Sequence, residues 1–162
     1  AGAIGSSKTP IAHFLSCRLN LPILDNDAIR SEVTEDEGAF DEQEYQKRRD
    51  ERIKEVIESG QNFIYSASVD RSGPRLKQVL DETGYKCFII SMDLSRDFLL
   101  KLYHAKNYHQ SLAILDESRA DHETFLEGYG KEVGLHITDK GFHNRLELSY
   151  SAVKSWIGTE CE

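Results

Sequence analysis

Short apolar runs alternate with longer amphipathic stretches along this chain, and that alternation limits the folds open to it. Four runs have the length and composition of buried strands: residues 21–25 (LPILD), 62–69 (NFIYSASV), 85–93 (YKCFIISMD) and 134–138 (GLHIT). The stretches between them, such as 41–59 and 95–107, carry apolar residues at helical spacing. We therefore expect an α/β fold in which helices flank both faces of a parallel central sheet.

Composition narrows the class of protein and of partner. A chain of 162 residues fits one domain, and no apolar run approaches the ~18 residues of a membrane span. The net charge of −8 disfavours nucleic acid and anionic membrane as partners, because both bind through neutralised phosphates. Cys17, Cys87 and Cys161 lack the spacing of a disulfide framework or zinc site. We expect a cytoplasmic protein with a small-molecule partner; the sequence leaves its oligomeric state open.

The first residues, AGAIGSSKTP, have the pattern of a phosphate-binding loop. Such a loop needs small residues for unusual backbone angles, inward N–H groups, a lysine for the outer phosphates and a hydroxyl for magnesium. Gly2, Gly5, Lys8 and Thr9 meet these needs at the spacing of the Walker A motif. Ser6 and Ser7 are the other predicted nucleotide-binding residues of this loop, although Ser7 stands where the motif has glycine.

Two other interpretations of this loop exist. A flexible turn would explain the glycines and serines, but not the Lys-Thr pair followed by an amphipathic helix. A dinucleotide-binding fingerprint would use Asp25 on a ribose, but Gly-x-Gly-x-x-Gly is absent and a lysine has no role in it. A phosphate loop also normally follows a buried strand, and only Ala1 precedes this one. We therefore expect the first strand to be truncated here.

The segment LDNDAIR places Asp27 and Arg30 one helical turn apart, just after a predicted strand. Phosphoryl transfer to a hydroxyl needs a group that orients or deprotonates the hydroxyl and a cation that grips the substrate. Asp27 and Arg30 suit these roles. Helix capping by Asp25 or Asp27, with Arg30 in solvent, is the alternative. The carboxyl ends of parallel strands share one sheet edge, so this segment and Ser66 are expected beside the loop.

With GAIGSSKT as phosphate loop and DAIR as the Asp-x-x-Arg element, the sequence resembles the small P-loop kinases of the polynucleotide-kinase-like and zeta-toxin-like type. These have an AAA-type ATP-binding domain and are related in build to shikimate and nucleoside kinases. The resemblance implies a three-layer P-loop NTPase fold over residues 1–162. It also implies an ATP- and magnesium-dependent phosphotransferase with Lys8, Asp27 and Arg30 as catalytic residues and Thr9 on the metal.

The sequence departs from this family at two places. Ser66 stands where members often have an acid that helps to hold magnesium, which leaves Thr9 as the metal ligand. The expected lid, about residues 101–125, lacks the paired arginines and offers Lys101, His104, Lys106 and Arg119, of which Lys106 is the candidate for nucleotide. A degenerate nucleotide-binding module acting through protein contacts is thus the alternative to a kinase. Toxin-like or regulatory action on a protein or nucleotide-sugar also stays open.

Overall fold

The computed structural model describes residues 1–67, 69–108 and 110–160, and alternates helices with parallel strands. Its first half contains α1 (Lys8–Leu19), β1 (Ile23–Asp25), α2 (Asn26–Glu37), α3 (Glu42–Glu58), β2 (Ile64–Ser66) and α4 (Val69–Glu82). The second half contains β3 (Ile89–Asp93), α5 (Arg96–Ala105), a 3-10 helix (Gln110–Ile114), α6 (Leu115–Tyr129), β4 (Val133–Thr138) and α7 (Arg145–Glu160). The α/β class expected from the sequence is confirmed.

The strands form two parallel pairs where one central sheet was expected. β1 pairs with β2 from Ile23 opposite Ile64 to Asp25 opposite Ser66, and β3 pairs with β4. The start of the chain runs beside β3, since Gly2 bridges to Met92 and the Met92 amide donates to the carbonyl oxygen of Ala1 at 3.1 Å. Because paired strands in each sheet run parallel, polar residues that end them gather at one edge of each pair.

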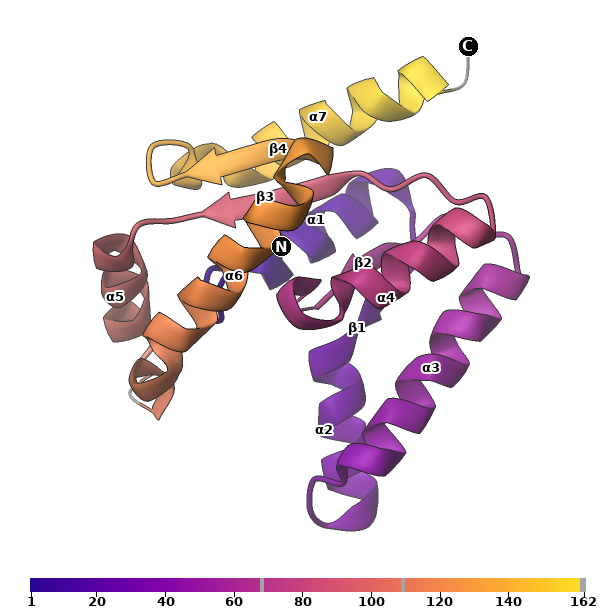
Figure 1. The fold of residues 1–162 in the computed structure, drawn as a ribbon, viewed down its shortest axis with the longest axis horizontal. Coiled ribbons are helices and arrows are strands. Elements are labelled where there is room, and N and C mark those ends of the chain that lie inside the picture. The colour runs from indigo at the N-terminus through magenta and orange to yellow at the C-terminus, as the bar shows by residue number, and fades with distance from the viewer. Residues whose placement is uncertain (68, 109, 161–162) are drawn as a thin grey trace.

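Helices lie on both sides of these strands. In Figure 1, α4 and α6 cross in front of the strands, while α1 lies behind β3, and contacts join α4 to α6 and α1 to α7. The helices α2 and α3 extend together away from the strands, and they enclose a small core of Ile29, Val33 and Tyr45.

The main core joins the loop end of the chain to its second half. It contains Leu99 and Tyr103 of α5, both 1% exposed, packed with residues of β3, β4 and α1. Its other buried members include Ala3, Ile11, Leu15, Met92, Leu94, Leu115, Ile137, Phe142 and Val153. Because Ala3 belongs to this core, the first residues of the glycine loop are anchored by apolar packing.

The strands β1 and β2 are shorter than their apolar runs suggest. β2 ends at Ser66, and α4 begins at Val69, within the run expected to be strand. The length of β2 is set by its partner strand, β1. Because β1 ends at Asp25, which caps α2, only three residues of β2 have a strand to pair with.

The described helices and cysteines bear on the predictions about membrane spans and disulfides. None of its helices combines the length and the apolar character needed to cross a membrane. Cys17 and Cys87 are free thiols at exposed positions; Cys161 lies outside the described residues.

Candidate active site

The loop from Gly2 to Ser7 adopts backbone angles that require small residues. Gly2 has φ +136° and Gly5 has φ +73°, both in the region that L side chains rarely adopt. A Cβ on Gly2 would come 2.8 Å from Cβ of Met92, and one on Gly5 would overlap Cε1 of Tyr103. Both glycines of the motif are therefore required by conformation and by space.

Ser7 adopts the conformation of the glycine that it replaces. Its φ of 70° and ψ of 39° are left-handed, and a Cβ there is strained by about 1–2 kcal/mol. Its side chain is buried, and its hydroxyl accepts a hydrogen bond from Nζ of Lys106 at 2.8 Å. This hydrogen bond offsets part of the strain, so the serine keeps the turn that glycine would make.

The ammonium groups of two lysines donate hydrogen bonds to carbonyl oxygens of the loop. Nζ of Lys8 donates to Gly2 at 2.5 Å and to Ala3 at 2.9 Å, and Nζ of Lys106 donates to Gly5 at 2.8 Å. Burial, with the charge of Arg145 nearby, lowers the pKa of Lys106, so an anion at this place would favour its charged form. α1 begins at Lys8, and its N-terminal dipole adds positive potential.

The α5 and α6 helices hold the middle of the loop. The hydroxyl of Tyr103 donates to the carbonyl oxygen of Ile4 at 2.5 Å, and the amide of Ile4 donates to Oγ of Ser118 at 2.7 Å. Ser6 is 1% exposed, and its buried hydroxyl has no hydrogen-bond partner among the described residues. Sequence reasoning missed Tyr103 and Ser118, because their contacts join residues about a hundred positions apart.

Arg145 is a further cation that the sequence analysis did not single out. Its guanidinium lies 4.2 Å from the ring centroid of Phe142 and donates to that residue's carbonyl oxygen at 3.0 Å. The Arg145 Nε is buried and has no hydrogen-bond partner in the described part of the chain, and burial lowers the pKa of the guanidinium. Arg145 follows β4 after a connection that contains a 3-10 helix, so the rule that sites lie beyond strand ends could have found it.

The structure places Asp27 and Arg30 on α2, where the capping alternative describes Asp25. Asp25 caps the helix, since its Oδ1 accepts from the Asp27 amide at 3.0 Å. The Asp27 side chain is exposed. The Arg30 guanidinium lies 4.2 Å from the centroid of Phe40 and 5.0 Å from that of Tyr45, which turns it toward the α2–α3 connection. The catalytic roles of both residues stay predictions.

The predicted magnesium ligand Thr9 lies exposed in the first turn of α1, and Ser66 is buried at the end of β2. Ser68, which belongs to the same polar stretch, lies outside the described residues. Among the side chains that the structure describes, no group of three His, Cys, Asp or Glu residues could hold a metal ion. Magnesium that keeps several waters and phosphate oxygens needs only one or two protein ligands, so Thr9 is compatible with it.

Of the lid candidates, Lys106 alone is brought onto the loop by a described contact. Lys101 and His104 lie exposed on α5, and Arg119 pairs with Glu123 at 2.8 Å on α6. Lys101 and His104 therefore lie on the solvent-exposed face of α5. A nucleotide contact stays a prediction for Lys106.

A second polar cluster lies where β3 ends. Asp93 accepts from Oγ of Ser91, contacts Nε2 of His122 at 3.0 Å, and contacts Nδ1 of His136 on β4 at 2.5 Å. Burial alone would raise the pKa of Asp93, but hydrogen bonds from His122, Ser91 and His136 outweigh it and hold the pKa well below its usual range. The cluster borders a cavity of about 590 Å³ whose wall includes Ala3 of the loop. This cluster was not singled out in the sequence analysis, because Asp93, His122 and His136 lie on three different elements.

Comparison with known proteins supports a kinase-like fold. A crystal structure described as that of a putative kinase from Chloroflexus aurantiacus matches with a TM-score of 0.55 over 93% of this chain and 91% of that one. The two sequences are 17% identical, so the match shows likeness of fold. No protein-family model matches the sequence. A search of curated proteins also found no match.

Proposed function

We propose that this protein is an ATP-dependent kinase that transfers a phosphoryl group to a small hydroxyl-bearing acceptor. The observation that carries the proposal is the loop itself: Gly5 and Ser7 are left-handed, and Lys8 and Lys106 direct ammonium groups onto it at the start of α1. A narrow turn with two cations and a helix N-terminus suits a polyphosphate. The kinase-like fold is consistent with this chemistry.

In this proposal, residues 1–162 act as one P-loop kinase-like domain of three layers, with a lid of about residues 101–125. The loop residues Gly2, Gly5, Ser6, Ser7 and Lys8 hold the ATP phosphates with Lys106. When bound at Thr9 and the phosphate oxygens, Mg²⁺ supplies charge neutralisation. The buried hydroxyl of Ser6, for which the described residues supply no partner, supports the assignment, because such a group is costly unless a ligand or water satisfies it.

The proposed reaction needs a base and an acceptor-binding cation. The bond between the γ-phosphorus and the oxygen that bridges it to the β-phosphate breaks, and a bond forms from that phosphorus to the acceptor oxygen. Asp27 takes the hydroxyl proton, so the products are ADP and a phosphate monoester. Arg30 binds the acceptor, for which its guanidinium would leave the rings of Phe40 and Tyr45. Lys8 and Lys106 hold charge on the transferring group.

Two variants test this proposal by separating binding from transfer. Lys8→Ala should weaken ATP binding at least tenfold in calorimetry, whereas Lys131→Ala, which removes an exposed lysine from another part of the surface, should leave it unchanged. Asp27→Asn should retain ATP binding and lose transfer in a screen of hydroxyl compounds. Transfer by Asp27→Asn at the rate of the unmodified protein would contradict the role of Asp27.

A degenerate nucleotide-binding module is the second candidate, and Ser66 favours it. Ser66 presents a hydroxyl where a metal-binding acid is expected, and it is 8% exposed. A module without metal chemistry should bind ATP equally with and without Mg²⁺. A kinase should bind ATP more tightly when Mg²⁺ is present.

A further inference from the structure

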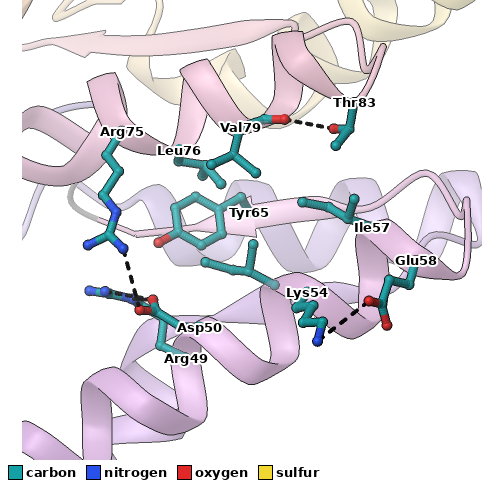
Figure 2. Close-up of a pocket in the computed structure, with 11 residues that line it drawn as sticks. Arg49, Asp50, Lys54, Ile57, Glu58, Tyr65, Arg75, Leu76, Val79 and Thr83 are labelled. Carbon is teal, nitrogen blue, oxygen red and sulfur yellow. Dashed lines mark hydrogen bonds and ion pairs between the residues drawn. The ribbon is translucent and has the colours of Figure 1, made fainter.

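A groove of about 400 Å³ lies between α3 and α4 (Figure 2). Its lining residues lie between positions 49 and 83, so none belongs to the glycine loop. Its walls are apolar because two helical stripes face each other: Ile53 and Ile57 on α3, and Leu76 and Val79 on α4. Figure 2 shows the ring of Tyr65, on β2, between the two helices. The volume falls within the range of small-molecule sites.

One end of the groove is charged. Asp50 accepts from Arg49 at 2.8 Å and forms an ion pair with Arg75 at 4.0 Å, so two guanidinium groups share one carboxylate. Lys54 pairs with Glu58 at 3.7 Å along the same helix. The lining therefore has three cations against two carboxylates, a local positive excess in a chain with a net charge of −8.

The charged end faces the part of the sheet where acceptor chemistry is proposed. Figure 2 shows the Tyr65 hydroxyl directed toward Arg49, Asp50 and Arg75. That hydroxyl accepts a hydrogen bond from Nδ2 of Asn26 at 3.0 Å, and Asn26 directly precedes Asp27 in the chain. The groove thus leads from an apolar cleft to the carboxyl ends of β1 and β2.

We infer that this groove is the acceptor subsite, and that the acceptor is a small molecule with an apolar ring body, one anionic group and a hydroxyl. The ring body packs between the stripes of α3 and α4, and Arg49 and Arg75 meet the anionic group. A molecule of this kind matches both the apolar walls and the cationic excess, whereas a neutral alcohol would match the walls alone. The assignment of acceptor rests on the proposed function; the binding of an amphipathic anion does not.

The test uses 2-hydroxy-2-(2-naphthyl)acetate as probe, because its hydroxyl and carboxylate lie at the same end of the ring. The matched compound that lacks the carboxylate is 2-naphthalenemethanol. Calorimetry on the full chain should show one binding site for the acid and at least fivefold weaker binding of the alcohol. Amide chemical shifts should move in α3 and α4. Equal binding of the two compounds, or shifts confined to other elements, would overturn the inference.

Two substitutions of Val79 that introduce opposite charges test whether the acid binds in this groove. Val79 is 36% exposed, so a charged residue there leaves the buried core intact. Val79→Glu should weaken binding of the acid at least tenfold, and Val79→Lys should weaken it clearly less. Both variants remove one apolar side chain from the wall, but only the glutamate repels the carboxylate of the acid. Equal losses in the two variants would overturn the role of charge.

The acceptor assignment is tested separately from the phosphate loop. Lys8→Ala should bind the acid as the unmodified protein does, while losing ATP. With ATP and Mg²⁺, phosphorus NMR should show the phosphate monoester of the acid. If the protein binds both ATP and the acid in the groove but forms no monoester, the acceptor assignment is overturned. If it binds the acid but no ATP, the proposed kinase function fails and the groove stands as a ligand site.

Discussion

Replacement of Gly5 by alanine is the perturbation whose effect the structure defines most sharply. Gly5 has φ +73°, and its added Cβ would overlap Cε1 of Tyr103 and lie 3.1 Å from Cδ1 and Cζ. The left-handed strain costs about 1–2 kcal/mol. The overlap adds about 1–3 kcal/mol of overpacking, because Tyr103 is 1% exposed and cannot turn into solvent. Gly5→Ala should therefore lose roughly 2–5 kcal/mol of unfolding free energy.

Gly38→Ala is the matched control. Gly38 has φ +74°, but apart from Gly38 itself and its two chain neighbours, no described residue has a heavy atom within 4 Å of an added Cβ. The substitution therefore brings the strain without the overlap. Urea unfolding should give a loss of about 1–2 kcal/mol for Gly38→Ala, and a clearly larger one for Gly5→Ala. Gly5→Ala should also lose ATP binding, which Gly38→Ala should retain.

A double variant isolates the contact with the ring. Tyr103→Leu removes the atoms that the new Cβ would overlap, so Gly5→Ala combined with Tyr103→Leu should be more stable than the sum of the single changes by at least ~1 kcal/mol. Equal losses for Gly5→Ala and Gly38→Ala, with no coupling to Tyr103, would refute the reasoning that the α5 ring fixes the loop.

The remaining predictions concern Ser7 and Asp93. Ser7→Gly relieves left-handed strain but loses the Lys106 hydrogen bond, so its free energy of unfolding should stay within about 1 kcal/mol of the unmodified protein. Ser7→Ala keeps the strain and loses the same hydrogen bond, so it should be about 1 kcal/mol less stable. Urea midpoints measure both variants, and a Ser7→Gly variant less stable than Ser7→Ala would contradict the strain at Ser7. Asp93 has a folded-state pKa below its unfolded value, so its stabilisation is present above about pH 4 and is lost as the pH falls further. Asp93→Asn should lose about 1–3 kcal/mol of unfolding free energy at about pH 7, and its stability should fall less steeply than that of the unmodified protein as the pH is lowered. Urea unfolding at several pH values checks both effects. An equally steep fall in stability would count against the Asp93 hydrogen bonds.

The sequence predicts the order of elements and the position of the loop, because both depend on local patterns. Helical spacing after Lys8 corresponds to α1, and the charged stretch from Asp41 to Ser59 corresponds to α3. Strand lengths were less predictable, since β2 is limited by its partner rather than by its own apolar residues. An apolar run shows what can be buried, and pairing decides how much of it becomes strand.

The surroundings of the loop were the hardest part to predict. Tyr103 reaches Ile4 across 99 positions, and Ser118 reaches the same residue across 114. No local pattern marks such pairs. The rule that polar residues gather at strand ends was applied to Asp25 and Ser66, and the same rule would have indicated Asp93 at the end of β3.

The central claim is that the loop binds the phosphates of ATP, and calorimetric titration of ATP with and without Mg²⁺ tests it most directly. We expect the unmodified protein to bind ATP more tightly with Mg²⁺, and Lys8→Ala to bind at least tenfold more weakly. Absence of ATP binding by the unmodified protein, or equal binding by Lys8→Ala, would contradict the claim.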